Sequence, residues 1–398
     1  MSAPDIRDRL GLKRVINVAG NMTSLGASIA RPEAIAAAAE MLPHFVSIDD
    51  LQRRASTAIA QATGAEAGCV TACASAGMSI AIAATMTGAD LAAIEALPTT
   101  GPRKRVVVQL GHMCHYSAPL EQSIRLTGAE IATFGNVNRA TAWQLAHVLD
   151  ETVTAMMFVV SHQTVQHGQV PLAECIRVCH AAGVPVIVDA AAETDLTGFI
   201  AAGADLVVYS AHKGLGSMTG GIVAGRKDLV RAAYLQSRGI GRGMKVGKEG
   251  IAAAIAALEA WPSRDHAGEQ AEQERVLDLW REALRDLPDA RVETVDDPTG
   301  NPIRRLAVRF LSANPAAAAA FADRLGDGDP AIVVRDEFID INRFDLDPCN
   351  LHPGEAEDVA ERLRSEAAKP GSTGGPAGGM SVAERQSAAT ARLLAWPD

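Results

Sequence analysis

Short aliphatic runs alternate with helical segments through the middle of the chain, and this alternation restricts the fold more than any other feature. Runs rich in Val, Ile and Leu occur at 106–109, 155–160, 184–188 and 206–210. Helical periodicity marks 119–126 and 172–182, and Gly183 follows the second segment as a helix C-terminus prefers. Because strands that are apolar on both faces are typical of parallel sheets covered by helices, the sequence predicts a doubly wound, mostly parallel α/β domain.

The 398 residues exceed what one core usually supports, so we expect more than one domain. Changes of texture predict an N-terminal helical segment (1–60), a large domain (61–262), a small α+β domain (263–368), and a connector and tail (369–398). Gly, Pro and Ser dominate the connector, which indicates flexibility. Residues 381–396 either form an amphipathic helix that docks on the body or on a partner subunit, or fray as a terminus.

The formal net charge of −10 argues against a nucleic-acid-binding protein, which needs a basic face. No run of about 18 apolar residues predicts a membrane span. Residues 1–10 mix acidic and basic side chains and lack the apolar core of a signal peptide. We therefore expect a cytoplasmic protein whose partners are small molecules and further copies of itself.

A metal site is the alternative use of a polar cluster formed by His112, Cys114 and His115. It would need a fourth ligand from elsewhere in the chain. Cys175 and Cys179 lie in a helical apolar pattern and are interpreted as core residues. We predict no metal site, whereas a zinc protein built on the cluster would contain stoichiometric metal.

The residues most informative about chemistry stand at the ends of two consecutive predicted strands. Asp189 ends the third aliphatic run, and Lys213 follows the fourth. The carboxyl ends of neighbouring parallel strands face one crevice. A buried carboxylate there needs a cationic partner such as a protonated pyridine nitrogen, and a lysine can form a Schiff base. With Ser210 and His212 between them, this spacing predicts pyridoxal 5'-phosphate held on Lys213. Taken alone, Asp189 would fit a helix cap and Lys213 would fit a solvated loop residue.

The phosphate of such a cofactor needs hydrogen-bond donors. Small residues before the helical run 80–86 let backbone N–H groups approach an anion at a helix N-terminus. We assign this role to three small residues and one further hydroxyl: Ser75, Ala76, Gly77 and Ser210. Glycines between 214 and 221 predict a second, flexible loop beside the cofactor.

A flat ring is expected to stack on the pyridine face and hold it. His115 follows the first strand of the predicted sheet and is our choice for this role, with Tyr116 as the alternative. An ordinary polar loop histidine would fit the same sequence.

Positive charge gathers among glycines near the end of the large domain of this acidic protein. The basic residues are Arg238, Arg242, Lys245 and Lys248. They predict a binding site for the carboxylate or phosphate of a substrate, and a solvated basic loop is the other interpretation.

On these residues, the chain from 14 to 261 resembles the fold-type I pyridoxal-phosphate enzymes, which have the aspartate aminotransferase-like transferase fold. Within them it is similar to the selenocysteine synthase-like group, and in particular to the D-glucosaminate-6-phosphate ammonia-lyases. The matching segments are INVAGNMTSLG (16–26), DDLQ (49–52), TGAEA (63–67), VDAAAE (188–193), SAHK (210–213) and IGRGMKVGKE (240–249). The aspartate-to-lysine framework is specific to the superfamily, and the last block points to the lyase-like branch.

The resemblance implies a Schiff base on Lys213, Asp189 at the pyridine nitrogen, and dimers or larger assemblies with sites at subunit interfaces. Two segments depart from the family pattern. Ala211 and His212 stand where the family usually has Gly-Gly or Gly-Asp, and the loop 214–219 lacks the common Gly-Pro-Gln. Both segments adjoin the expected site, so the resemblance does not fix the identity of the substrate.

The implied activity is that of a lyase: loss of a β-hydroxyl from a hydroxy amino acid or amino sugar acid gives an enamine, which tautomerises and hydrolyses to a 2-keto acid and ammonia. The Lys213 amine would remove the Cα proton, and His212 or His115 would protonate the leaving hydroxyl. A racemase or epimerase, an aldolase and a transaminase share the first half of this chemistry. A selenium transferase is disfavoured because it must bind a large tRNA, and a non-catalytic scaffold because Lys213 and Asp189 are both present.

Overall fold

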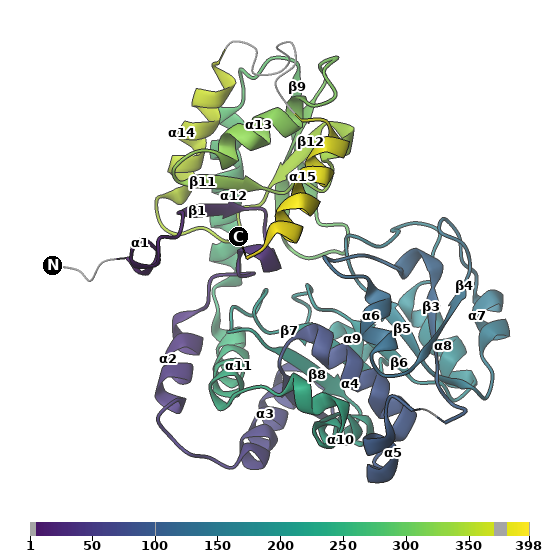
Figure 1. Ribbon diagram of the computed structural model, residues 1–398. Helices are drawn as coiled ribbons and strands as arrows, with labels where there is room; N and C mark the ends of the chain where they lie inside the picture. Colours follow the sequence, from purple (N-terminus) through teal and green to yellow (C-terminus); the bar gives the residue numbers. More distant parts are fainter. Residues whose placement is uncertain (1–4, 100, 370–379, 398) are drawn as a thin grey trace. The chain divides into compact units, whose positions relative to one another are not determined.

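The computed structural model, which describes residues 5–99, 101–369 and 380–397, consists of two compact units (Figure 1). The large unit is Ala30–Arg264, and the small unit combines Met1–Ile29 with Asp265–Asp398. Within the described ranges, no helix has the length and apolar character needed to span a membrane.

The large unit is built around one seven-stranded sheet with the strand order β2-β8-β7-β6-β5-β3-β4. Its strands are β2 (Ala67–Thr71), β3 (Arg105–Gln109), β4 (Glu130–Phe134), β5 (Val153–Val159), β6 (Val186–Asp189), β7 (Leu206–Ser210) and β8 (Gly221–Gly225). All neighbours are parallel except β8, which runs antiparallel to β2 and β7. The prediction of a mostly parallel, doubly wound sheet is confirmed.

Helices cover both faces of this sheet (Figure 1). In chain order they are α2 (Pro32–Met41), α3 (Ile48–Thr63), α4 (Ala74–Thr87), α5 (Leu91–Ala96), α6 (Leu120–Arg125), α7 (Ala142–Val148), α8 (Leu172–Ala181), α9 (Gly198–Ala201), α10 (Lys227–Leu235) and α11 (Lys248–Ala260). Side chains alternate along the strands between two apolar clusters, with Val107 and Val188 in one and Val108 and Ile187 in the other. Burial on both faces explains why the central strands are almost entirely aliphatic.

The antiparallel strand β8 was not predicted, because it begins and ends with glycine. The sequence analysis placed Gly221 in a flexible loop, and this was wrong. An added Cβ would lie 2.3 Å from Cys73 O at Gly221 and 2.1 Å from Asp205 O at Gly225. These glycines therefore mark close approach of backbone segments inside a sheet.

The small unit contains a three-stranded antiparallel sheet and a separate two-stranded parallel pair. The sheet has the order β12-β10-β9, and its strands are β9 (Ala290–Asp296), β10 (Arg304–Phe310) and β12 (Arg343–Leu346). The pair joins β1 (Val15–Val18) to β11 (Ala331–Val334). The helices are α1 (Ile6–Leu10), α12 (His266–Ala283), α13 (Ala317–Gly326), α14 (Glu355–Ala367) and α15 (Val382–Ala395).

This division differs from the expected one at the N-terminus. Residues 1–60 do not form a segment of their own, because β1 pairs with β11 of the small unit while α2 and α3 pack on α11 of the large unit. A pair of strands so far apart in the sequence leaves no local signal. The expected end of the large domain at 262 lies next to the observed end at Arg264.

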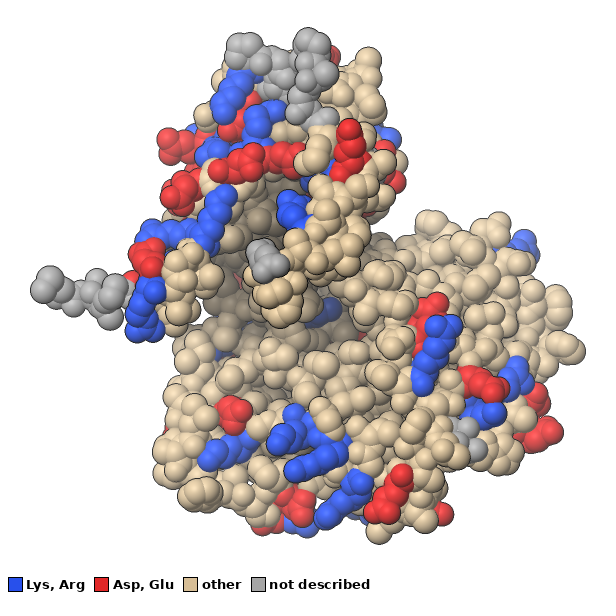
Figure 2. All heavy atoms as spheres, in the orientation of Figure 1, with Lys and Arg blue, Asp and Glu red and all other residues tan. Residues whose placement is uncertain are grey.

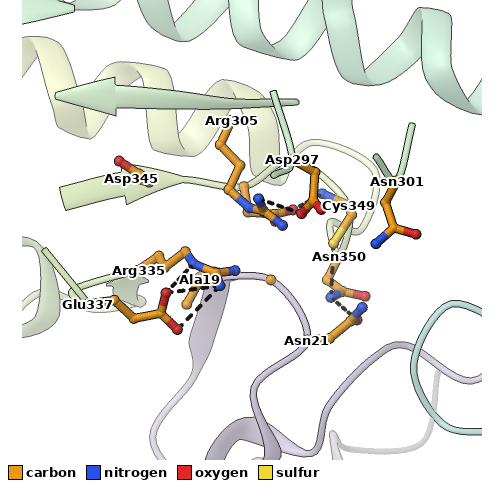
Figure 3. A network of polar contacts seen from close by, with 12 residues as sticks. Ala19, Asn21, Asp297, Asn301, Arg305, Arg335, Glu337, Asp345, Cys349 and Asn350 are labelled. Atoms are coloured by element: carbon orange, nitrogen blue, oxygen red, sulfur yellow. Dashed lines mark hydrogen bonds and ion pairs between the residues drawn. The ribbon is translucent and has the colours of Figure 1, made fainter. Parts of the chain in front are cut away.

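A buried ion-pair network holds the N-terminal segment within the small unit (Figure 3). Arg305 donates to Asp347 (Nε to Oδ2, 2.8 Å) and to Asp297 (Nη1 to Oδ2, 2.9 Å), and both carboxylates are buried. The backbone N–H of Asp347 also donates to Val18 O (2.8 Å). Gly20 lies so close that an added Cβ would be 2.8 Å from Asp347 Oδ2. The glycine of the N-terminal motif is thus required by packing against a carboxylate.

The described part of the tail is the helix α15, whose first turn carries a capping box formed by Ser381 and Glu384. Arg385 of α15 donates to Ala319 O (3.4 Å) and pairs with Asp323 of α13. Of the two interpretations of the tail, a helix docked on the body fits these contacts. The connector expected before it lies outside the described residues, apart from Lys369 and Met380.

Acidic and basic side chains lie side by side over the small unit (Figure 2). Its ion pairs include Arg275 with Glu272 at 2.8 Å and Arg285 with Glu282 at 2.5 Å. Exposed pairs of this kind contribute little to stability. Charges of both signs are therefore interspersed on this face of the small unit.

Asp205 ties the amino end of β7 to its surroundings. Its buried carboxylate accepts hydrogen bonds from Val186 N (2.8 Å), His180 Nε2 (2.8 Å) and Arg226 Nη1 (3.0 Å). These contacts lie at the opposite end of the strand from Ser210, and hence away from Lys213.

We expect Asp205→Ala to lower the free energy of unfolding by about 2 kcal/mol, because a buried backbone N–H and two side chains lose their acceptor. Asp228→Ala is the matched control, since it removes an exposed partner of the same Arg226 and should cost less than about 1 kcal/mol. Urea unfolding measures both changes. Equal losses in the two variants would contradict this account of Asp205.

Candidate active site

The sheet brings Asp189 and Lys213 to one edge. Asp189 is the last residue of β6, and Lys213 comes three residues after the end of the parallel neighbour β7. The Asp189 side chain is buried, and burial raises its pKa. The positive charge of Lys213 lies close enough to oppose this effect and lower the pKa of Asp189. The two residues on which the expected chemistry depends are therefore neighbours.

The surroundings of Asp189 fit a pyridine nitrogen. Asp189 Oδ1 accepts a hydrogen bond from Ala191 N (3.1 Å), and no second donor to this carboxylate occurs among the described residues. A buried carboxylate with unused acceptor capacity is costly unless a donor, here a pyridinium N–H, completes its bonding.

Ser217, in the turn after the lysine, is a second buried polar group with unused hydrogen-bonding capacity within the described ranges. It follows Lys213 by four residues, it is 2% exposed, and its Oγ has no hydrogen-bond partner in the part of the chain that the structure describes. Such a hydroxyl can bond a polar group, and the acceptor on Asp189 suits the pyridinium nitrogen of pyridoxal phosphate. The sequence analysis missed Ser217, whose only signal is a hydroxyl in the loop after the lysine.

Ser210 and His212 form a hydrogen-bonded pair beside the lysine. Ser210 Oγ lies 3.2 Å from His212 Nδ1. Burial, and then the charge of Lys213, lower the pKa of His212. The imidazole is therefore neutral at pH 7 and can accept a proton at one nitrogen while it donates from the other. A phosphate bound by Ser210 would have to share this hydroxyl with His212.

The expected phosphate cradle lies at the N-terminus of α4, but its three residues differ in availability. Cys73 caps the helix, because Ala76 N donates to its Sγ (3.4 Å) and Gly77 N to its carbonyl oxygen (2.9 Å). An added Cβ on Gly77 would lie 3.0 Å from a side chain of β7, so this glycine serves helix-to-sheet packing. Ser75 is exposed, with its Oγ 2.9 Å from Ser123 Oγ. It stands in the first turn, where N–H groups have no intrahelical acceptor, and is the member of the set most open to an anion.

The two candidates for the stacking ring lie in different environments. His115 is exposed, and its backbone forms an isolated bridge with Pro119. Tyr116 is half-buried with its hydroxyl 3.5 Å from Ser123 Oγ. Burial raises the pKa of Tyr116 to about 12, and the charge of Asp189 acts in the same direction. Tyr116 is thus close enough to Asp189 for the carboxylate charge to reach it.

The basic residues differ in their surroundings. Gln236, in the same short turn as Arg238, donates through Nε2 to Thr87 Oγ1 (2.9 Å) at the last residue of α4. Gly239, whose carbonyl accepts from Arg242 N (3.0 Å), packs on Ile94 of the next helix. The phosphate cradle lies at the first turn of α4, and a helix of 14 residues is about 20 Å long. The turn that carries Arg238 therefore lies at the opposite end of α4 from the cradle.

Lys245 and Lys248 complete the basic set, and Lys248 has a structural contact. Lys245 is exposed. Lys248 Nζ donates to His44 O and lies 5.5 Å from the centroid of the Phe45 ring. Lys248 therefore holds the loop between α2 and α3, a role that its sequence context did not indicate.

The first residue of the alternative metal cluster, His112, is not available to bind a metal in the structure. His112 Nδ1 accepts a hydrogen bond from Val159 N (3.0 Å), and His112 Nε2 lies 3.0 Å from Gln109 Nε2. Burial lowers the pKa of His112 to about 4. Because both ring nitrogens are engaged, His112 is a core histidine.

Comparison with known proteins agrees with this geometry. The family model for the beta-eliminating lyases matches residues 33–296. A D-glucosaminate-6-phosphate ammonia lyase from Salmonella typhimurium (strain 14028s / SGSC 2262) is 37% identical over 366 residues, which cover 92% of this chain and 98% of that protein. A 5'-C-glycyluridine monooxygenase-decarboxylase from Streptomyces sp is 36% identical over 364 residues, which cover 89% of this chain and 90% of that protein.

Solved structures extend the match to three dimensions. A structure of D-glucosaminate-6-phosphate ammonia-lyase aligns with a TM-score of 0.82 at 36% identity, covering 92% of this chain and 99% of that chain. An aspartate aminotransferase from Thermus thermophilus aligns with a TM-score of 0.55 at 13% identity, covering 90% and 93%, and shows the shared fold-type I architecture. Since the family model covers more than half of the chain and a relative exceeds 30% identity over nearly its whole length, the chain belongs to the beta-eliminating lyases, a family of pyridoxal-phosphate-dependent enzymes.

Proposed function

We propose that this enzyme removes ammonia from a hydroxy amino acid or an amino sugar acid to give a 2-keto acid: water is first eliminated, and a water is taken up again when the resulting imine hydrolyses to the keto acid and ammonia. The observation that carries the proposal is the buried Asp189 carboxylate, with an unused acceptor, beside Lys213 at one sheet edge. The near full-length similarity to D-glucosaminate-6-phosphate ammonia lyase supports this reaction and makes a phosphorylated amino sugar acid the first substrate to test.

Each residue of the edge has a defined task. Bound pyridoxal phosphate supplies an electron sink for the charge left at Cα when its proton departs. Lys213 holds the cofactor, and its amine, once freed by the substrate, takes the Cα proton. Asp189 keeps the pyridine nitrogen protonated, because a buried carboxylate is stable opposite a cation. His212, neutral and next to Lys213, would relay the proton that the Lys213 amine takes from Cα to the leaving hydroxyl. Exposed His115 is the alternative donor.

Cofactor attachment is tested by absorbance. Wild-type protein with pyridoxal phosphate should show a band at the violet end of the visible range that borohydride removes while labelling Lys213. Lys213→Ala should lack this band. Asp189→Asn should keep it but lose about 100-fold in kcat, because a neutral amide does not hold the charge of the ring nitrogen. An unchanged band in Lys213→Ala would rule out attachment at Lys213.

A second candidate activity is an oxygen-dependent decarboxylation, favoured by the monooxygenase-decarboxylase relative at nearly the same identity. The racemase or epimerase, aldolase and transaminase alternatives share the removal of a bond at Cα and differ in their products.

Product analysis separates these activities. D- and L-hydroxy amino acids and amino sugar acids, each with and without a phosphate group, serve as substrates. We expect equal amounts of ammonia and 2-keto acid, without oxygen uptake, and a preference for the phosphorylated compounds. Oxygen uptake with release of carbon dioxide would support the second candidate, and an inverted stereocentre would support racemisation.

We also propose that the protein acts in the cytoplasm as a homodimer or larger homo-oligomer, with the basic residues serving a neighbouring copy. Arg238 and Arg242 are exposed, and the turn that carries Arg238 lies at the opposite end of α4 from the cradle of the same copy. The loop held by Lys248 presents bare apolar side chains, since Phe45 is 101%, Val46 40% and Ile48 43% exposed. An apolar loop beside exposed cations suits a contact between copies.

Subunit mixing tests this arrangement. Lys213→Ala and Arg242→Gln should each be nearly inactive, but a reassociated 1:1 mixture should regain about one quarter of the wild-type activity if the assembly is a dimer. Half of the dimers are then mixed, and each of these has one site with both residues intact. Lys213→Ala mixed with Asp189→Asn is the matched control, because both changes damage the site of the same copy. Absence of recovery in the first mixture would refute a contribution across the interface.

A further inference from the structure

We propose that Arg264 is a positioning residue for Lys213, which it holds through the backbone of the turn that follows the lysine. The inference rests on the proposed role of Lys213. It concerns a residue outside every motif that the sequence analysis used.

Arg264 binds the turn directly. Its Nη1 donates to Gly214 O at 2.9 Å, although the two residues are 50 positions apart in the chain. Its guanidinium carbon also lies 4.8 Å from the centroid of the Trp261 ring, and Trp261 packs against the core of the large unit. A cation bound to a carbonyl oxygen makes a strong hydrogen bond, and stacking on an indole fixes its direction. The bond is therefore made by an arginine that is already oriented.

The turn itself is tight. Gly216 N donates to Lys213 O (2.9 Å), with Gly216 at a φ of 68°, where glycine is favoured. An added Cβ on Gly214 would lie 2.9 Å from Thr194 Cγ2. These two glycines therefore permit a compact turn after Lys213.

The chain enters and leaves the large unit against this turn. Gly216 O accepts a hydrogen bond from Arg31 N (2.7 Å), and Arg31 is the second residue of the large unit. Arg264, which holds Gly214, is its last residue. The carbonyl groups one and three residues after Lys213 are thus bound by the two segments that connect the large unit to the rest of the chain. A change in either segment would act on the lysine turn through one hydrogen bond.

Such restraint matters because the Lys213 amine must reach two positions in turn, the cofactor aldehyde and the Cα proton. Misplacement of a reacting group by about 1 Å can cost about 100-fold in rate. The hydrogen bond from Arg264 removes freedom from the backbone next to Lys213, and so from the base of its side chain. Trp261 contributes by holding the guanidinium in place.

The test uses Arg264→Ala, Arg264→Lys and, as a matched control, Arg54→Ala, which removes an exposed arginine paired with Glu259 on α11. Three quantities are measured: amide hydrogen exchange of residues 211–221 in the cofactor-free chain, the rate at which added pyridoxal phosphate forms the borohydride-sensitive band, and kcat with KM. For Arg264→Ala we expect exchange at least about 10-fold faster, since a charge-assisted hydrogen bond is lost. Band formation should slow, and kcat should fall about 10-fold or more with KM within about threefold.

Arg264→Lys should recover part of each change, because lysine keeps the charge but offers no planar fork. Arg54→Ala should behave as the wild type. Exchange and kinetics of Arg264→Ala that match the wild type would overturn the inference. So would a loss that follows a lower melting temperature alone, with normal kinetics in the folded fraction. If borohydride fails to label Lys213 in the wild type, the proposed function fails, whereas the exchange data still decide whether Arg264 restrains the turn.

Discussion

The parallel pairing of β6 with β7 is the interaction on which the site depends. In its register Asp189 lies opposite Val208, so the end of one strand and the segment after the other emerge at the same edge of the sheet. A slip of one residue would turn every side chain of a strand to the other face. The register is strongly fixed because both faces of these strands are packed in apolar clusters. The position of the carboxylate relative to the lysine is thus a consequence of aliphatic packing elsewhere.

This dependence explains what could be predicted from the sequence. The aliphatic runs of β3, β5, β6 and β7 are visible because central parallel strands are buried on both sides. Asp189 and Lys213 follow from them, since the ends of such runs define the ligand-binding edge. The pairing of β1 with β11 could not be predicted, because the two strands lie more than 300 residues apart in the sequence and each has only four residues. The strand β8 was hidden because its glycines have the composition of a loop.

The roles of glycine and other small residues around the site were the hardest to predict from the sequence, for a physical reason. A missing Cβ serves a mobile loop, an anion cradle and a close packing contact equally well. Gly77 faces a side chain of β7, Gly214 faces Thr194, and Gly221 faces a backbone carbonyl, so all three are explained by contact within the protein. The same ambiguity affects cations. Lys248 belongs to a basic cluster in sequence, yet it binds His44 O beside Phe45. Only coordinates separate these uses.

The two relatives of almost equal identity show where the specificity of this enzyme should be sought. One is named as an ammonia lyase and the other as a monooxygenase-decarboxylase, so sequences of this kind carry differently named activities. The pair Asp189 and Lys213 belongs to the common first half of such reactions and cannot distinguish them. The segments that depart from the family pattern, Ala211 with His212 and the loop 214–219, lie directly before and after the lysine instead. Burial and the charge of Lys213 lower the pKa of His212, and the Ser217 hydroxyl has no hydrogen-bond partner among the described residues, so these two flanking residues are the first to compare between relatives that carry different activities.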